Sequence, residues 1–179
     1  KNILGTFYYP LEVYNNISIL KTNQPYYSRQ GFSEIFKYGL LASKELLETY
    51  DKYNNNQSEK VLIKIIELTI TARSIIRKKD ALASNLGHTF GHALEKISNY
   101  EVLHGDAISV GTVMALYFAL DRGLISQSKV DEIVTKMRQH KLNIYLDSKI
   151  DVSEMVNCML NDKKSSVDTI NLVLLRDIE

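Results

Sequence analysis

The sequence contains very little cysteine and proline, and it contains no tryptophan. One cysteine, Cys158, and two prolines, Pro10 and Pro25, occur among 179 residues. A single cysteine excludes an internal disulfide framework and fits a reducing compartment, so we expect a cytoplasmic protein. Because both prolines lie near the amino-terminal end, the rest of the chain is open to uninterrupted helices.

Long runs of like charge and long apolar runs are also lacking. The 22 basic and 21 acidic residues give a formal charge of +1, and their even spread predicts no nucleic-acid and no membrane partner. No segment reaches the roughly 18 apolar residues of a transmembrane helix, and no signal peptide is recognisable. The chain begins at Lys1 in sequence that already looks structured, so we expect it to be a piece of a longer polypeptide.

Apolar residues recur mainly with a helical period, which predicts a mainly α-helical, multi-helix domain over residues 1–179. We expect residues 1–30 to be irregular, the almost wholly apolar segment 106–119 to cross the core, and the run INLVLL at 170–175 to form one short terminal strand. The expected helices cover residues 32–53, 61–76, 87–97, 106–119, 126–140 and 151–160.

Three of the four histidines lie close together in the sequence. His88 and His92 are four residues apart, so on a helix they share one face, and His104 follows next to a glycine. Gly87 and Gly91 occupy positions where a better helix former would be favoured by about 1 kcal/mol, which predicts that another group comes close there. This grouping suggests a metal site, although histidines at this spacing can also form an ordinary polar patch.

Three protein ligands with an open position are typical of a catalytic zinc site, whereas a structural zinc needs four cysteine or histidine ligands. The residues themselves favour the three clustered histidines as ligands. A carboxylate is the natural further partner, and spacing alone does not choose among the candidates Glu34, Glu95, Glu101 and Asp106.

Several strings, taken in order, resemble the carboxy-terminal half of the 3-dehydroquinate synthase family. They are KNILGTFYYP, RQGFSEIFKYGLL, NLGHTFGHALE, HGDAISVG, and DKK followed by INLVLL. The resemblance implies the helical carboxy-terminal domain that this family shares with iron-containing alcohol dehydrogenases. It also implies a homodimer.

The resemblance implies a metal site made of Glu34, His88 and His104. It assigns His92 to the substrate site, in contrast to the set of three histidines. We favour the Glu/His/His set, because it leaves His92 available for proton chemistry beside the metal. Lys37 lies one helical turn beyond Glu34 on the same face, so it is expected to act in the same pocket as a catalytic and substrate-binding residue.

Further substrate-binding residues follow from the same resemblance. Asn85, three residues before the first clustered histidine, is expected to bind substrate hydroxyls, and Asn2 is expected to do likewise. Lys163 and Lys164 of the DKK string are expected to supply cations, and the sequence does not choose which of the two faces the substrate.

The activity implied by the resemblance is the conversion of 3-deoxy-arabino-heptulosonate 7-phosphate to 3-dehydroquinate and phosphate, a step of aromatic amino acid biosynthesis. It needs NAD and a divalent ion, Zn²⁺ or Co²⁺. A related cyclase of the 2-deoxy-scyllo-inosose or valiolone type would share the fold and the metal. A helical scaffold domain without catalytic activity is the alternative from a different class.

The chain departs from the family pattern in two places. Ala81 stands where an arginine is expected, and an expected lysine falls on Ala72, or on Arg73 if the alignment shifts by one. The connection at residues 80–85 is therefore either shortened in the protein, or the residues of a loop are absent from this sequence, and we favour the second interpretation. No glycine-rich turn for NAD is present, so we expect the nucleotide-binding domain to be missing from this chain and the chain to be inactive by itself.

Overall fold

The computed structural model describes residues 4–6, 8, 10–146, 150–160 and 169–176. Within these residues all regular structure is helical, which confirms the predicted fold class. The helices are η1 (Ile17–Thr22), α1 (Pro25–Ala42), α2 (Lys44–Asn56), α3 (Glu59–Lys79), η2 (Ala81–Asn85), α4 (His88–Ile97), α5 (His104–Asp121), α6 (Gln127–Gln139) and α7 (Val152–Leu160), where η denotes a 3₁₀ helix.

The amino-terminal helices differ from the prediction at two points. Helix α1 begins at Pro25, inside the segment expected to be irregular, because proline is well suited to the first helical position. The single helix expected over residues 32–53 is divided at Ser43, whose backbone is extended. The Ser43 hydroxyl accepts a hydrogen bond from Leu46 N at 3.1 Å and so caps α2.

The terminal strand was predicted wrongly. Among the described residues, 170–175 form no strand and pair with no neighbouring strand. The segment instead lies along the helices, and apolar side chains such as Leu174 and Leu175 contact both hydrophobic clusters. Apolar residues with β-branches fit an extended, half-buried segment, but a strand also needs a hydrogen-bonding partner.

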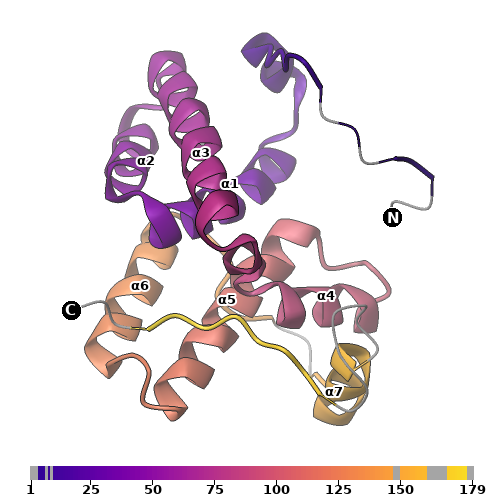
Figure 1. Cartoon of the computed structure of the whole chain (residues 1–179). Coiled ribbons are helices and arrows are strands. Elements are labelled where there is room, and N and C mark those ends of the chain that lie inside the picture. Colours follow the sequence, from indigo (N-terminus) through magenta and orange to yellow (C-terminus); the bar gives the residue numbers. More distant parts are fainter. Residues whose placement is uncertain (1–3, 7, 9, 147–149, 161–168, 177–179) are drawn as a thin grey trace.

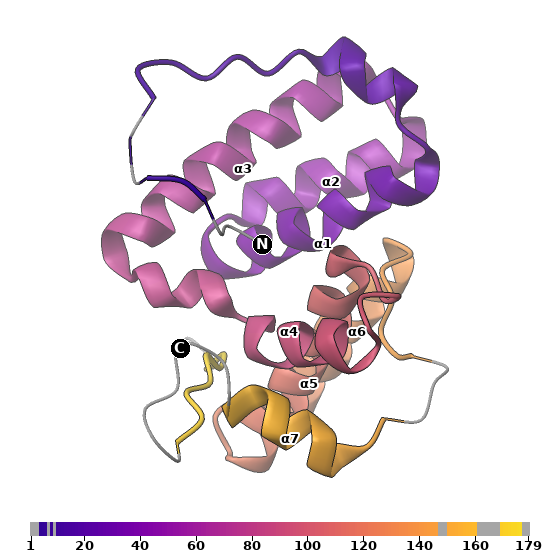
Figure 2. The same cartoon turned by 90° about the vertical axis from the view of Figure 1, so that its right-hand side faces the viewer.

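The described helices form two groups (Figures 1 and 2). Helices α1, α2 and α3 lie together in one group, and α4, α5 and α7 form the other, with α6 packed beside α5. Helix α5 contacts both α1 and α4, and most of its residues are buried, as predicted for the apolar segment 106–119. The two groups therefore meet at α5, and the amino-terminal end of this helix carries His104.

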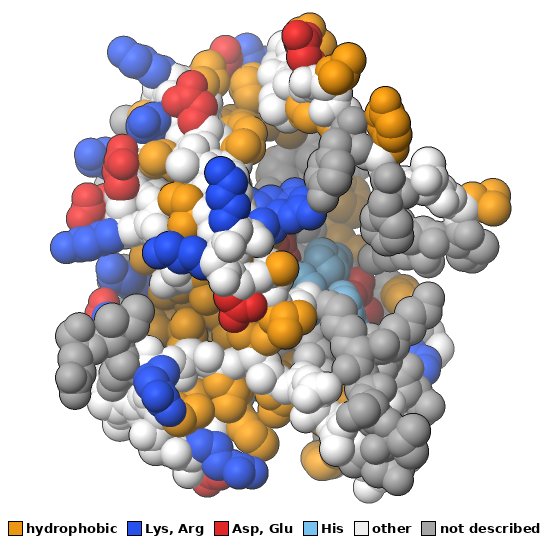
Figure 3. Space-filling model, viewed as in Figure 1, with side chains coloured by type: hydrophobic (Ala, Val, Ile, Leu, Met, Phe, Trp, Pro, Cys, Tyr) orange, Lys and Arg blue, Asp and Glu red, His pale blue; other side chains and the backbone are white. Residues whose placement is uncertain are grey.

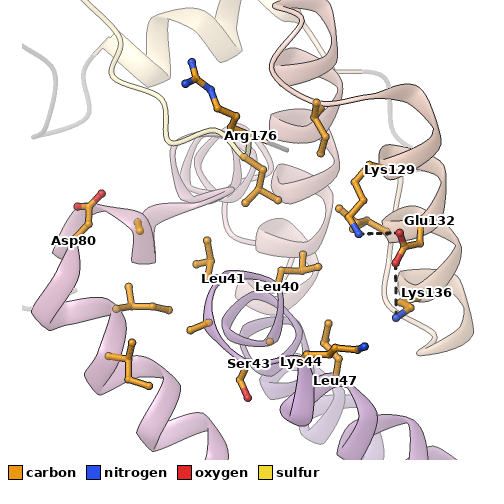
Figure 4. Close-up of a pocket in the computed structure, with 18 of the residues that line it drawn as sticks. Leu40, Leu41, Ser43, Lys44, Leu47, Asp80, Lys129, Glu132, Lys136 and Arg176 are labelled. Atoms are coloured by element: carbon orange, nitrogen blue, oxygen red, sulfur yellow. Dashed lines mark hydrogen bonds and ion pairs between the residues drawn. The ribbon is translucent and has the colours of Figure 1, made fainter. Parts of the chain in front are cut away.

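A large cavity of about 1160 Å³ lies between α1, the end of α3 and α6 (Figure 4). Its floor is apolar, and on its rim Glu132 pairs with Lys129 at 2.8 Å and with Lys136 at 4.0 Å. The described residues that line it include no histidine.

None of the helices described is both long enough and apolar enough to span a bilayer.

Candidate metal centre

Glycines allow α4 and α5 to pack in very close contact. A Cβ atom added at Gly111 of α5 would lie 2.2 Å from the carbonyl oxygen of Gly87, and one added at Gly91 would lie 3.0 Å from that of Ala107. Gly87 also has a φ of +74°, which favours glycine, and it precedes the first residue of α4. The close approach predicted from the glycines is thus made by a helix of the protein, and the rings of His88 in α4 and His104 in α5 lie 5.8 Å apart.

A second close contact joins α1 to the start of α5. A Cβ atom at Gly105 would lie 2.3 Å from the carbonyl oxygen of Gln30, so only glycine fits there. The Gln30 side chain accepts a hydrogen bond from Asp106 N at 2.9 Å and donates one to Asp106 Oδ2 at 2.9 Å. Gln30 lies one helical turn before Glu34, so this contact sets Glu34 opposite His104.

These contacts bring together side chains from three helices. Glu34 Oε1 lies 3.3 Å from His88 Nε2 and 3.9 Å from His104 Nε2. One potential ligand atom from each of the three residues lies within 4.8 Å of the other two. Glu34 and His104 are 70 residues apart in sequence, so only tertiary packing makes them neighbours.

The hydrogen bonds around the three side chains leave lone pairs facing one another. His88 Nδ1 lies 3.1 Å from the carbonyl oxygen of Leu86, and His104 Nδ1 lies 3.2 Å from Glu95 Oε2. Both partners accept hydrogen bonds, so in the neutral rings the proton is on Nδ1 and Nε2 carries the lone pair. Glu34 Oε1 is buried and receives no hydrogen bond from the described residues.

Three converging acceptor atoms without a donor between them repel one another unless a cation lies among them. Two imidazole nitrogens and one carboxylate oxygen suit a divalent ion of intermediate softness, such as Zn²⁺ or Co²⁺. Bonds of about 2.0–2.1 Å in a tetrahedral site place ligand atoms about 3.3 Å apart, close to the observed distances. Three ligands would also leave a coordination position for substrate.

Lys37 is almost fully buried beside Glu34. Its Nζ donates hydrogen bonds to Glu34 Oε2 at 2.7 Å and to the carbonyl oxygen of Ser84 at 2.8 Å, and it lies over the Tyr38 ring. Burial by itself would raise the pKa of Glu34, but the pKa is lowered, and the charge and hydrogen bond of Lys37 contribute to this lowering. Glu34 is therefore an anion at neutral pH.

A cavity of about 500 Å³ opens directly beside this cluster. Its lining includes Glu34, His88 and His104, together with Lys37 and Arg73 and several polar and apolar side chains. In Figure 3, histidine side chains are visible in a hollow that has lysine or arginine side chains along its upper edge. The cavity thus combines a potential metal site with positive charge, which suits an anionic, hydroxyl-bearing ligand.

Sequence-predicted residues are only partly gathered here. Asn85 lines the cavity, whereas His92 is exposed, with its ring 5.4 Å from that of His88 and 6.1 Å from that of His104. In the described residues His92 groups with Glu95 and His104, so the three histidines do not form one ligand set. Of the other carboxylates considered, Glu101 is exposed and Asp106 bonds Gln30.

Asn2, Lys163 and Lys164 lie outside the described residues. Of the two positions that the family lysine could occupy, Ala72 is buried in the core and Arg73 lines the cavity.

Sequence reasoning missed Gln30 and the carbonyl group of Ser84. The only feature of the sequence that could have indicated Gln30 is its position one turn before Glu34. The carbonyl group of Ser84 could not be predicted, because every residue has a backbone carbonyl.

Several solved structures share this fold, and two of them contain bound cofactors. A 2-deoxy-scyllo-inosose synthase complexed with carbaglucose-6-phosphate, NAD⁺ and Co²⁺ matches with a TM-score of 0.78 and 24% identity, over 98% of this chain and 52% of that chain. A 2-epi-5-epi-valiolone synthase from Streptomyces hygroscopicus with NAD⁺ and Zn²⁺ bound matches with a TM-score of 0.67 and 18% identity, over 80% and 43%. The chain therefore shares its fold with these two synthases.

Sequence comparison is more specific. The family model for the 3-dehydroquinate synthase C-terminal domain matches residues 31–165, and the chain belongs to this family. It is 34% identical over 186 residues to a 3-dehydroquinate synthase of Acetivibrio thermocellus, and 35% identical over 184 residues to one of Aliivibrio fischeri. The alignments cover 98% and 97% of this chain and 51% of each relative, so the chain spans about half the length of these relatives.

Proposed function

We propose that this chain is the metal- and substrate-binding part of a 3-dehydroquinate synthase, which converts 3-deoxy-arabino-heptulosonate 7-phosphate to 3-dehydroquinate and phosphate. The observation that carries the proposal is the convergence of lone pairs from Glu34, His88 and His104 beside a cationic cavity. Family membership supports the choice of reaction.

In this proposal Glu34, His88 and His104 hold Zn²⁺ or Co²⁺. The bound ion would supply Lewis acidity at the substrate hydroxyl that is oxidised. Two neutral imidazoles and one carboxylate leave a net positive charge at the ion, which favours an alkoxide over the neutral hydroxyl. Lys37 keeps Glu34 ionised and in place through its 2.7 Å contact.

The remaining roles concern substrate. Lys37 and Arg73 would attract its anionic groups, and Asn85 would bind hydroxyls from the cavity wall. His92 would exchange protons with the substrate from the exposed face of α4. Asn2 and one of Lys163 and Lys164 would complete the site from parts of the chain that the structure does not describe.

NAD, the second cofactor of the proposed reaction, would be bound by a nucleotide-binding domain outside this chain. Both solved relatives contain NAD⁺ together with a divalent ion, which supports this arrangement. We further propose that the whole protein is a cytoplasmic homodimer with a small sugar-acid phosphate as its substrate.

The decisive experiment measures phosphate release by the intact protein with NAD and Zn²⁺ or Co²⁺. Three substrates are compared: 3-deoxy-arabino-heptulosonate 7-phosphate, glucose 6-phosphate and sedoheptulose 7-phosphate. Release from the first alone is expected, and it should be abolished in Glu34→Ala. Preference for either of the other two would indicate a related cyclase, and no release together with no metal binding would indicate a scaffold domain. The 179-residue chain by itself should be inactive, and steady turnover by it would refute the proposed division of labour.

A further inference from the structure

Glu95 is a buried carboxylate next to a proposed metal ligand. Glu95 is only 5% exposed, and it is the only buried acidic residue in the part of the chain that the structure describes. An ionised carboxylate is rarely buried without a partner, because water solvates it far better than apolar surroundings do. Its Oε2 lies 3.2 Å from His104 Nδ1, so His104 is a partner that justifies the burial.

His104 lies between two carboxylates, one at each ring nitrogen. Nδ1 faces Glu95, while Nε2 faces Glu34 Oε1 at 3.9 Å. A ring that donates its Nδ1 proton to Glu95 must present a lone pair at Nε2 toward Glu34 and His88. With the other tautomer, a proton would occupy the place where the lone pair has to be.

We propose that Glu95 is a positioning residue that selects the Nδ1–H tautomer of His104, fixes the orientation of its ring and thereby strengthens metal binding. The inference rests on the proposed metal centre. A carboxylate behind a ligating imidazole acts in this way in many metal sites, because it orients the ring and increases its basicity.

The two imidazoles of the site differ in how they are fixed. The Nδ1 atom of His88 faces the backbone carbonyl of Leu86, which no side-chain substitution removes. His104 depends on a side chain, so a change at Glu95 affects one ligand and leaves the other as a reference within the same protein.

A different reading would make Glu95 a direct ligand, because His92, Glu95 and His104 also form a group that could hold an ion. That ion would have to take the Nδ1 atom of His104, and His92 is exposed at the surface. A neutral imidazole that binds an ion through Nδ1 carries its proton on Nε2, which would remove it from the set with Glu34. We therefore assign Glu95 to the hydrogen bond.

The test uses Glu95→Ala and Glu95→Gln in the intact protein, with Glu101→Gln as a control that removes an exposed carboxylate from the connection between α4 and α5. Zn²⁺ and Co²⁺ affinities are measured by competition with a chelator. The tautomer of each ring in the metal-free protein is read from ¹⁵N NMR of labelled histidine, and circular dichroism checks that each variant is folded.

We expect Glu95→Ala to weaken metal binding by about 10- to 100-fold and to convert His104 into a mixture of tautomers. Glu95→Gln should show a smaller loss, since its amide oxygen still accepts a hydrogen bond, and Glu101→Gln should bind as the wild type does. The tautomer of His88 should be unchanged in all variants. A purely structural role for Glu95 would lower stability without changing the tautomer or the affinity of the folded protein.

Three results would overturn the inference. The first is wild-type affinity in folded Glu95→Ala, and the second is an unchanged His104 tautomer in that variant. The third is a second bound ion per chain that disappears in Glu95→Gln, which would make Glu95 a ligand. If Glu34→Ala also binds metal like the wild type, the metal centre itself is wrong, whereas a defect in Glu34→Ala without one in Glu95→Ala refutes only the role of Glu95.

Discussion

Replacement of Gly111 by alanine should separate the two helices that carry the histidines. The added Cβ atom would lie 2.2 Å from the carbonyl oxygen of Gly87 and 2.7 Å from the amide nitrogen of Gly91. Both are backbone atoms at the start of α4, and the amide of Gly91 donates to the carbonyl of Gly87 in the first turn of that helix. Neither atom can rotate away, so α4 and α5 must move apart by about 1 Å.

Two effects of opposite sign decide the stability of Gly111→Ala. Alanine favours a helix over glycine by about 1 kcal/mol. Overpacking of a rigid contact costs about 1–3 kcal/mol, and contact with backbone favours the upper end. We expect a net loss of about 2 kcal/mol in the free energy of unfolding, which for a chain of this size lowers Tm by roughly 4–8 °C.

Gly31→Ala is the matched control, because it is also a glycine to alanine change within a helix, and its added Cβ atom meets nothing within 4 Å. This variant should be up to about 1 kcal/mol more stable than the wild type. Urea unfolding of both variants measures the difference, and a zinc titration should show weaker binding in Gly111→Ala. If Gly111→Ala is as stable as the wild type, the close packing of α4 on α5 is refuted.

Three further predictions concern charges and metal. Lys37→Met should lose about 2 kcal/mol in the free energy of unfolding in urea, because it leaves the partly buried carboxylate of Glu34 without its cation. A loss below about 0.5 kcal/mol would contradict this. Zn²⁺ at 100 times its Kd should add about 2.7 kcal/mol to the free energy of unfolding, reversibly with a chelator, and an equal gain in Glu34→Ala would argue against the site. Burial lowers the pKa of His140, although Asp51 at 2.8 Å opposes this effect. The unfolded chain therefore binds the proton more readily, and stability should fall as pH drops through about 6.5 and below. His140→Gln should flatten this dependence in thermal unfolding, and an unchanged slope would refute the assignment.

Much of the helical structure could be predicted from the spacing of apolar residues, because that signal is local. The segment 106–119 illustrates this, since its apolar character indicated a buried helix and α5 is one. The break at Ser43 was missed because serine is tolerated within a helix as well as at a cap. The strand expected at 170–175 was wrong because strand formation depends on a partner elsewhere in the chain.

The candidate site shows a similar division. The motifs named Glu34, His88 and His104, and the described structure places their ligand atoms within 4.8 Å of one another. Spacing alone had favoured three histidines, because periodicity describes only one helix at a time. The expected lysine fell on Ala72, or on Arg73 if the alignment shifts by one, and the structure buries Ala72 and places Arg73 at the cavity.

The sequence by itself determined which residues are candidate ligands, most of the helices that carry them and the family to which they point, since these depend on residue types and on short-range spacing. The tertiary structure alone decided which nitrogen of His104 faces Glu34 and that Glu95 lies behind it. The reason is that three helices meet at this point through contacts between residues far apart in sequence. Their separation is set by glycines such as Gly105 and Gly111, whose neighbours no local pattern reveals.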